Sequence, residues 1–272
     1  MDGQLCLYSS EKERCGDLML SYFVRMHGTI KKFSPIIGGY LKTFLFFVRR
    51  KLFGKSITSA QYSGMKFVFR YQDMSAIEET LMRGEYDFIV PVLKSVESPV
   101  IIDVGMNVGD FAVMALAHNS KSRIIGIEAH PGTAQIAERN SLLNQDKKWV
   151  VHNRAAWKNN DVIYLETGNV SVSTKVSNSG KLPVQGMDMP SLFKLLHEDC
   201  VDIMKIDIEG AEEDFLCAYP EYLSKIQHLI VEIHPLACDE MKIRNVLNLR
   251  FSKVEDVSGR ISSKPLLHCS HI

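Results

Sequence analysis

The 272-residue chain lacks several signatures by which a protein can be classified at once. Its six cysteines are scattered and form no Cys-x-x-Cys pair, which argues against a zinc site. Lysine plus arginine and aspartate plus glutamate both number 32, so the balanced charge gives no reason to expect a nucleic-acid partner. The stretch from Met1 to Arg14 is too polar for a secretion signal. We therefore expect a cytoplasmic protein with free thiols.

A hydrophobic run long enough to cross a membrane is also lacking. The most apolar stretch, Ile36–Val48, is short for a crossing and contains Lys42. Basic residues flank it, and the chain up to Tyr71 holds twelve lysines and arginines against four acidic residues. Three alternatives stay open: a helix packed on the rest of the protein, a helix in peripheral contact with an anionic membrane through residues 31–51, and a transmembrane anchor.

The chain does contain a regular alternation of strands and helices after Pro99. Short apolar runs predict strands at Val100–Val104, Arg123–Glu128, Trp149–Asn153, Val201–Asp207 and His228–His234. Amphipathic segments predict helices at Gly109–His118, Gly132–Leu143, Met189–His197, Ala211–Leu223 and Cys238–Leu247. This alternation is typical of an α/β fold with a mostly parallel sheet and helices on both faces. We place this domain at residues 73–272, after a basic, partly helical extension at residues 1–72.

Two further features complete the predicted fold. The segments Asp161–Leu165 and Val170–Val176 read as a hairpin inserted over the site, with Gly168 and Asn169 as its turn. The segments Phe251–Val257 and Pro265–Ile272 are predicted as two final strands at one edge of the sheet.

The clearest functional signal is the turn that follows the first of these strands. The strand ends at Asp103, and Gly105, Asn107 and Gly109 form a tight turn before the next helix. A strand, a glycine turn and a helix N-terminus bring backbone N–H groups close to a small ligand. The next strand ends in Glu128, at the spacing where nucleotide-binding folds hold ribose hydroxyls with a carboxylate.

The identity of the cofactor depends on the glycine pattern. A dinucleotide fold needs G-x-G-x-x-G, but here Asn107 and Asp110 hold the second and third glycine positions. Asp110 at the helix start would repel a diphosphate, whereas S-adenosylmethionine carries a sulfonium and an ammonium and tolerates carboxylates. We therefore favour S-adenosylmethionine over NAD. An NAD-dependent sugar-modifying oxidoreductase and a non-catalytic nucleotide-binding module remain as alternatives.

A second group of charged residues lies at the ends of two later strands. Lys205, Asp207 and Glu209 alternate along one strand and share one side of it, and Glu232 and His234 repeat this pattern on the next strand. Ligands of open α/β sheets bind beyond the carboxyl ends of strands, so we expect both groups beside the cofactor turn. The alternative is an internal ion network, for instance of Lys205 with Asp207 and Glu232.

Taken together, these motifs resemble the FkbM-type S-adenosylmethionine-dependent methyltransferases. The matching pieces run in the family's order: Gly84–Tyr86, Asp103–Gly109, Ile127–Pro131, Asn140 with Asn144, Arg154–Ala156, Met187–Asp188, Lys205–Glu212 and Val231–His234. Two positions depart from the family pattern, Met106 where alanine is frequent and His130 where a Glu-Pro pair is common. Neither removes a needed chemical group.

The resemblance implies a class I methyltransferase sheet of seven strands with the last antiparallel, and methylation of oxygen on sugars, glycans or natural products. It also implies a set of cofactor-binding residues. Asp103, Gly105 and Gly109 would shape the methionine pocket together with Asn107, Glu128 would bind the ribose, and the segment around Ala156 would face the adenine. Asp207 completes the set of predicted cofactor contacts.

Methyl transfer to a hydroxyl needs a group that accepts the hydroxyl proton. We predict His234 as this base, because an unperturbed imidazole titrates near neutral pH, with Asp207 and Glu209 as further bases or as groups that orient the hydroxyl. The alternative is a Mg²⁺ or Mn²⁺ ion held by the same three residues, which we do not assume. The sequence names no acceptor and no oligomeric state.

Overall fold

The computed structural model describes residues 24–54, 57–166, 175–176, 180–196, 198–259 and 264–271. The chain divides into two compact units, Met1–Gln61 and Tyr62–Ile272. The predicted turn at Gly168 and Asn169 lies outside the described residues.

The described residues of the first unit include two helices separated by a pair of glycines. Residues 24–37 are helical, and α2 (Tyr40–Phe53) follows. Gly38 and Gly39 between them have φ angles of 96° and 109°, which side chains of L-residues rarely adopt, so the helix breaks here. The predicted apolar stretch is therefore divided between two helices. Among the described residues, no helix combines the length and apolar character that a bilayer crossing requires.

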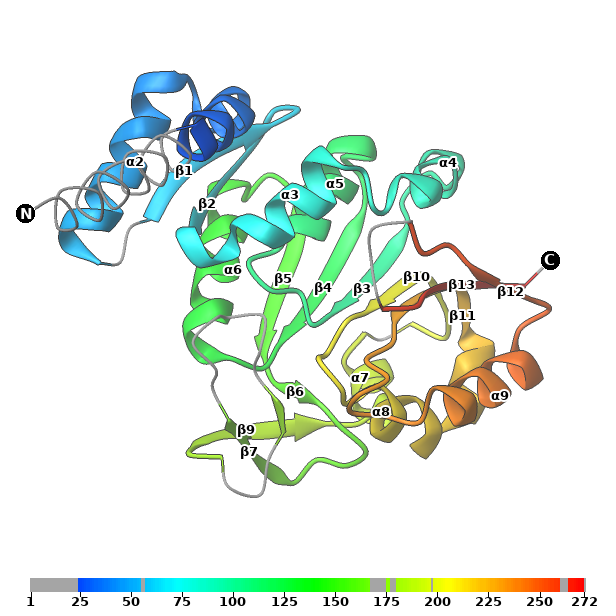
Figure 1. The fold of residues 1–272 in the computed structure, drawn as a ribbon. Helices are drawn as coiled ribbons and strands as arrows, with labels where there is room; N and C mark the ends of the chain where they lie inside the picture. The colour runs from blue at the N-terminus through cyan, green and yellow to red at the C-terminus, as the bar shows by residue number, and fades with distance from the viewer. Residues whose placement is uncertain are drawn as a thin grey trace, which may run out of the picture. The chain divides into compact units, whose positions relative to one another are not determined.

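The second unit is built on a sheet of seven strands (Figure 1). Their order is β12-β13-β11-β10-β3-β4-β5, and all neighbours are parallel except at β13, which is antiparallel to both strands beside it. The strands are β3 (Val100–Val104), β4 (Arg123–Glu128), β5 (Lys148–Asn153), β10 (Val201–Ile206), β11 (Ile226–Glu232), β12 (Lys253–Asp256) and β13 (Leu266–Ser270). This is the predicted class I methyltransferase sheet, and the fold prediction is confirmed.

Helices cover both faces of this sheet (Figure 1). From β3 the chain adds β4 and β5 on one side of the sheet, with α5 and α6 as the connecting helices. From β10 it adds strands on the other side, with α8 and α9 as connections. Because such crossovers are right-handed, the two pairs of helices lie on opposite faces of the sheet. The helices of the unit are η1 (Tyr71–Asp73), α3 (Met74–Met82), η2 (Asp87–Ile89), α4 (Val90–Ser95), α5 (Asp110–His118), α6 (Pro131–Leu143), α7 (Met189–Leu196), α8 (Glu212–Ala218), η4 (Pro220–Lys225) and α9 (Glu240–Arg250).

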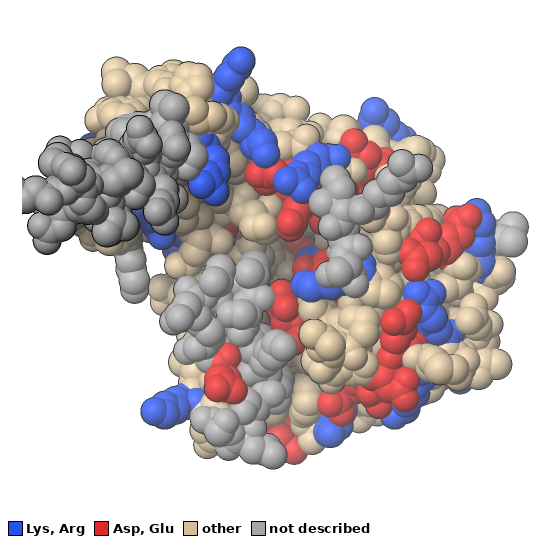
Figure 2. Space-filling view, in the orientation of Figure 1, with Lys and Arg blue, Asp and Glu red and all other residues tan. Residues whose placement is uncertain are grey.

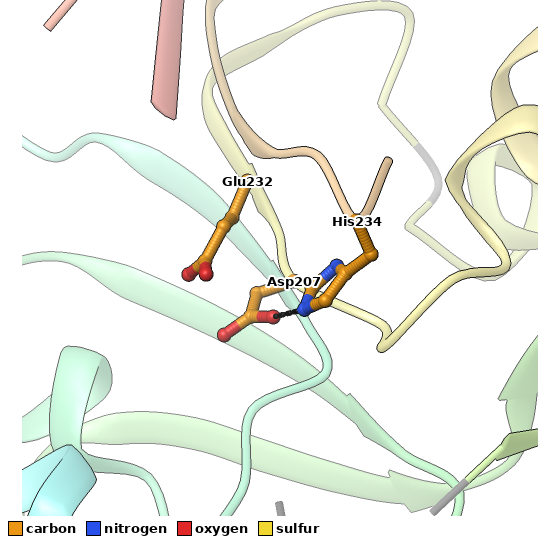
Figure 3. A group of neighbouring side chains, drawn as sticks. All are labelled: Asp207, Glu232 and His234. Carbon is orange, nitrogen blue, oxygen red and sulfur yellow. Dashed lines mark ion pairs between the residues drawn. The ribbon is translucent and has the colours of Figure 1, made fainter. Parts of the chain in front are cut away.

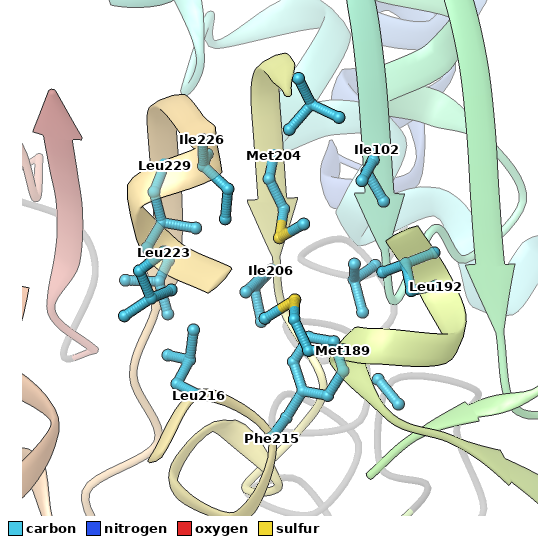
Figure 4. Close-up of a cluster of buried hydrophobic side chains, with 14 of the residues drawn as sticks. Ile102, Met189, Leu192, Met204, Ile206, Phe215, Leu216, Leu223, Ile226 and Leu229 are labelled. Carbon is cyan, nitrogen blue, oxygen red and sulfur yellow. The ribbon is translucent and has the colours of Figure 1, made fainter. Parts of the chain in front are cut away.

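A large apolar cluster joins the sheet to α7, α8 and α9 (Figure 4). Met204 and Ile206 of β10 are fully buried against Met189 of α7 and Phe215 of α8. Burial on both faces explains why these strands read as continuous apolar runs. The cluster holds β10 rigid up to the point where its polar residues begin at Asp207.

The asparagines of the family motif serve the fold. Asn140 of α6 and Asn144, which follows the end of this helix, each use the amide group to bond the backbone of β2 (Met65–Arg70), at Val68 and Lys66. Asn140 also donates to the carbonyl of Val108 in the cofactor turn, over 2.8 Å. These amides satisfy backbone groups that would otherwise be buried without partners.

A smaller sheet has the order β6-β9-β7-β8, with the strands β6 (Ala155–Ala156), β7 (Val162–Glu166), β8 (Lys175–Val176) and β9 (Leu182–Met187). The antiparallel pairing of Leu165 with Val176 agrees with the predicted hairpin. One predicted helix is shorter than expected: α8 ends at Ala218, and the 3-10 helix η4 begins at Pro220, which has no N–H group to continue an α-helix.

Candidate active site

The cofactor turn joins β3 to α5 through residues in the left-handed region. Gly105, Asn107 and Gly109 have φ angles of 73°, 50° and 88°. A Cβ atom on Gly105 would overlap the backbone carbonyl of Asp207, and one on Gly109 would overlap the ring of Trp149. The glycines are therefore required by close packing against β10 and β5, in addition to any ligand.

Glu128, at the end of β4, braces this turn. Its Oε2 accepts the N–H of Asn107 over 3.0 Å, and its Oε1 accepts the N–H of His130 over 2.8 Å. Burial raises the pKa of Glu128 to about 7, although both backbone donors favour the carboxylate. The residue predicted to bind ribose is thus already oriented by two hydrogen bonds.

Asp103 and Lys205 form a buried pair beneath the turn. The Lys205 Nζ lies 3.5 Å from Asp103 Oδ1 and 3.8 Å from Asp207 Oδ2, and it donates to the carbonyl of Gly105 over 2.9 Å. Burial raises the pKa of Asp103 to about 6, and Lys205 opposes this effect. Burial lowers the pKa of Lys205, but the facing carboxylates of Asp103 and Asp207 outweigh it, so the net shift is upward. Of the ion network considered as an alternative, the contact of Lys205 with Asp207 is present, whereas Glu232 pairs with Lys264.

A cavity of about 720 Å³ opens above this pair. It is lined by six residues predicted for the site: Gly105, Asn107, Glu128, Ala156, Asp207 and Glu209. Asp103, Gly109 and His234 are not among its lining residues, because the first is fully buried, the second packs on Trp149 and the third is covered by its neighbours.

The wall of the cavity is more acidic than basic. Its acidic residues are Glu79, Glu85, Asp110, Glu128, Asp207, Glu209 and Glu232, against the basic residues Arg83, Arg154, Lys205 and Lys264. Burial, together with the charge of Glu232, raises the pKa of Glu85 to about 7. Charges of both signs are visible around the central hollow of the molecule in Figure 2. An excess of carboxylates suits a ligand with net positive charge.

His234 follows β11 and points toward Asp207 (Figure 3). Its Nδ1 lies 2.8 Å from Glu212 Oε1, and its Nε2 lies 3.2 Å from Glu209 Oε2 and 3.8 Å from Asp207 Oδ1. Burial lowers the pKa of His234, but hydrogen bonds to Glu209 and Glu212 outweigh it and raise the pKa to about 10. The expectation of a near-neutral imidazole is therefore wrong: at neutral pH the carboxylates keep a proton on the ring.

Lys264 completes this cluster. Its Nζ lies 2.7 Å from His234 Nε2 and 3.1 Å from Glu232 Oε1. Lys264 therefore adds a basic side chain to the carboxylates that surround His234. Lys264 was missed by the sequence reasoning because it lies 30 residues from His234 and belongs to no motif.

Glu212 is a second residue that the sequence reasoning left without a role. It is fully buried, and besides His234 its Oε1 accepts the N–H groups of Ile208 and Gly210. These bonds hold the loop in which Glu209 adopts a φ angle of 54°, an unusual value for a residue with a side chain. The motif Lys205–Glu212 included this residue, and its buried position at the start of α8 identifies it as the support of the loop.

Three ligand atoms of this cluster are close enough to share a metal ion. Those of Asp207, Glu232 and His234 lie within 4.8 Å of one another. However, the Lys264 ammonium lies beside both Glu232 and His234, so a cation of the protein itself already pairs with the Glu232 carboxylate at this position. We therefore describe the group as an ion network and assign no metal to it.

Comparisons with known proteins identify the family of the chain. The family model of the methyltransferase FkbM domain matches residues 103–257, more than half of the chain. Hexuronic acid methyltransferase AglP from Haloferax volcanii is 25% identical over 178 residues, which cover 64% of this chain and 73% of that protein.

Solved structures of methyltransferases resemble the chain at lower identity. Magnesium protoporphyrin IX methyltransferase from Synechocystis, solved with bound S-adenosylmethionine, is 11% identical with a TM-score of 0.44, over 74% of this chain and 83% of that one. The methyltransferase domain of METTL16 is 13% identical with a TM-score of 0.47, over 85% of this chain and 79% of that one.

The family match begins at Asp103 and includes the cofactor turn, Glu128, Asp207 and His234. These are the residues that the structure brings around or beneath one cavity. The cofactor is S-adenosylmethionine, and the chain belongs to the FkbM family of S-adenosylmethionine-dependent methyltransferases.

Proposed function

We propose that the protein methylates a hydroxyl oxygen on a sugar, glycan or natural-product acceptor. The observation that carries the proposal is the cavity of about 720 Å³, which reaches from the cofactor turn to the carboxylates at the ends of β10 and β11. Its volume lies within the range of sites for small molecules and cofactors. The similarity to a hexuronic acid methyltransferase supports a sugar as the acceptor.

The lining residues suit the cofactor. The acidic wall matches the positive charges of the sulfonium and ammonium groups. The side-chain Nδ2 of Asn107 is buried without a hydrogen-bond partner among the described residues, so it is a donor available to the cofactor. We assign the ribose hydroxyls to Glu128 and the adenine to the segment around Ala156. Gly105 would lie beside the methionine part, whereas Asp103 and Gly109 act from behind the cavity wall.

The proton of the acceptor hydroxyl is best received by Asp207. When bound, S-adenosylmethionine supplies an activated methyl group. Asp207 lines the cavity, and its Oδ1 is buried with no hydrogen-bond partner among the described residues. Glu209 lies on the same wall and would orient the hydroxyl. His234, already protonated, would stabilise these two carboxylates.

The proposal also covers where the protein is located in the cell. A cytoplasmic location is supported by the cysteines of the described segments, all four of which are free. We also propose a peripheral contact with a membrane through residues 31–51, while most of the chain remains in water.

The test is turnover with chemically matched acceptors. Purified protein would be incubated with S-adenosylmethionine and a hexose glycoside, the corresponding hexuronic acid, or the corresponding amino sugar, and S-adenosylhomocysteine would be measured. We expect a new O–CH₃ signal by NMR, and a loss of about 10²–10⁴ in turnover for Asp207→Asn with cofactor affinity retained. Methylation at nitrogen, or a fully active Asp207→Asn variant, would contradict the proposal.

A further inference from the structure

The helix α2 has two apolar faces, and among the described residues only one of them is buried. Thr43 and Phe46 are its buried residues and lie on one side. Leu41, Leu45 and Leu52 have exposed fractions of 68%, 44% and 68%. Their spacing, with Val48 between Leu45 and Leu52, is four, three and four residues, which places them in one stripe on the side opposite to Phe46.

Among the described residues of this unit, the charged side chains have a single sign. Residues 24–54 contain seven lysines and arginines and no aspartate or glutamate. On the helical wheel, Lys42 and Arg49 lie side by side along one edge of the stripe, and both are exposed. Lys42 bends back to donate to the backbone and hydroxyl oxygens of Ser59, which holds it at this edge.

Exposed leucines bordered by basic side chains form the pattern of a helix that lies in the plane of an anionic membrane. We infer that the Leu41, Leu45, Val48 and Leu52 stripe of α2 binds the surface of a bilayer that contains anionic lipids. The inference deepens the peripheral contact proposed above, and it holds or fails independently of methyl transfer. The positive charges of Lys42 and Arg49 along its edge favour this occupant over a second copy of the same stripe, which would bring like charges together.

Two contributions would make up the free energy of membrane binding. Each leucine that moves from water into the interfacial region contributes through the hydrophobic effect, and each basic residue near an anionic surface adds electrostatic attraction. Neither contribution suffices alone for stable attachment, so binding should require both the apolar stripe and anionic lipid.

Vesicle co-flotation of the full chain tests the inference. We expect binding to vesicles of phosphatidylcholine with about 30% phosphatidylserine, weak binding to phosphatidylcholine alone, and release at about 0.5 M salt, because salt screens charges beyond a few ångströms. The variant Leu41→Glu/Leu45→Glu/Leu52→Glu should lose at least about tenfold in bound fraction. Arg49→Glu should weaken binding only to the anionic vesicles.

The matched control places three glutamates on the other unit. Leu142, Leu236 and Leu249 are at least as exposed, at 68%, 102% and 83%, so Leu142→Glu/Leu236→Glu/Leu249→Glu makes the same chemical change elsewhere. This variant should bind vesicles like the wild type, and circular dichroism and S-adenosylmethionine titration should show both variants folded. Equal binding by the two triple variants would overturn the inference. So would a wild-type dimer without lipid that the α2 variant converts to a monomer.

Discussion

At the residue scale, Glu212 controls the protonation of His234. Burial raises the pKa of Glu212, but its hydrogen bond to His234 outweighs this and lowers it, which marks the pair as an ionic one. We predict that Glu212→Gln lowers the pKa of His234, because the amide keeps the shape of the side chain and loses its charge. Turnover should fall by about tenfold to a hundredfold, with cofactor affinity nearly unchanged.

The imidazole ¹⁵N signals of His234, followed from pH 6 to pH 11, measure the pKa of this side chain directly. Glu213→Gln is the matched control, because Glu213 bonds Lys242 and Asp239 on the surface and does not touch the histidine. Identical titration of His234 in the wild type and in Glu212→Gln would show that the carboxylate has no such role.

Glu128 provides the second prediction for a single residue. Glu128→Ala should weaken S-adenosylmethionine binding by about 1–3 kcal/mol, because charge-assisted hydrogen bonds to the ribose are lost. Since Glu128 also accepts the N–H groups of Asn107 and His130, part of the loss comes from a looser turn. Glu128→Gln retains an oxygen that can accept one of these N–H groups, so this variant should lose less cofactor affinity. Calorimetry that gives wild-type affinity for Glu128→Ala would refute the assignment.

The site residues that the sequence predicts differ from those that it does not predict in whether a local sequence pattern reveals them. Gly105, Glu128 and Asp207 were found because each lies at the end of an apolar strand, a position that a local pattern reveals. The surroundings of His234 were not predictable in this way, because Glu212 and Lys264 lie 22 and 30 residues away and meet it only in the folded sheet. The raised pKa of His234 follows from the carboxylates of Glu209 and Glu212, of which the sequence analysis gave a role only to the first.

At the scale of elements, strands were predicted more closely than helix ends. β3 and β4 begin and end at the predicted residues, because buried parallel strands are uniformly apolar and stop at a charge or a glycine. The end of α8 was misplaced, because an apolar pattern continues into η4 although the helix does not. The break at Gly38 and Gly39 was missed, since the apolar composition continues across it.

The cofactor turn allows a prediction at this scale. Gly105→Ala should abolish S-adenosylmethionine binding and lower the unfolding free energy by at least about 3 kcal/mol, because its methyl group meets the Asp207 carbonyl, which belongs to rigid backbone. Gly64→Ala is the control: its φ angle of 89° is similar, but no atom lies within 4 Å of the added carbon. It should cost only about 1–2 kcal/mol from backbone strain and leave binding intact. Thermal melts and calorimetry on both variants separate the effect of the steric clash from that of backbone strain. Equal losses of stability and of cofactor affinity in the two variants would contradict the role assigned to the clash.

At the scale of the whole molecule, the acidic cavity links stability to pH. The pKa values of Asp103, Glu85 and Glu128 are raised to about 6, 7 and 7 in the folded state. A carboxyl group with a raised pKa favours folding while it is protonated, so its contribution is complete below the unfolded value near 4 and is lost as the pH rises through the folded value. The contribution of these three carboxyl groups to the free energy of unfolding should therefore fall between about pH 4.5 and pH 7.

Binding of a positively charged cofactor should show the opposite trend. A cation in the cavity favours the ionised carboxylates, so S-adenosylmethionine should bind more tightly as the pH rises from 5 to 8 and should release protons on binding, which calorimetry in buffers of different ionisation enthalpy detects. Glu85→Gln should reduce both trends and stabilise the cofactor-free protein at pH 8 by about 1–2 kcal/mol, since a buried charge is removed. Glu97→Gln, which alters a carboxylate 84% exposed beside Lys121, should change neither trend. If cofactor affinity and stability changed with pH in the same way in the wild type and in Glu85→Gln, the cavity carboxylates would be ionised throughout this pH range. The excess of acidic groups would then act on the cofactor only as fixed negative charge.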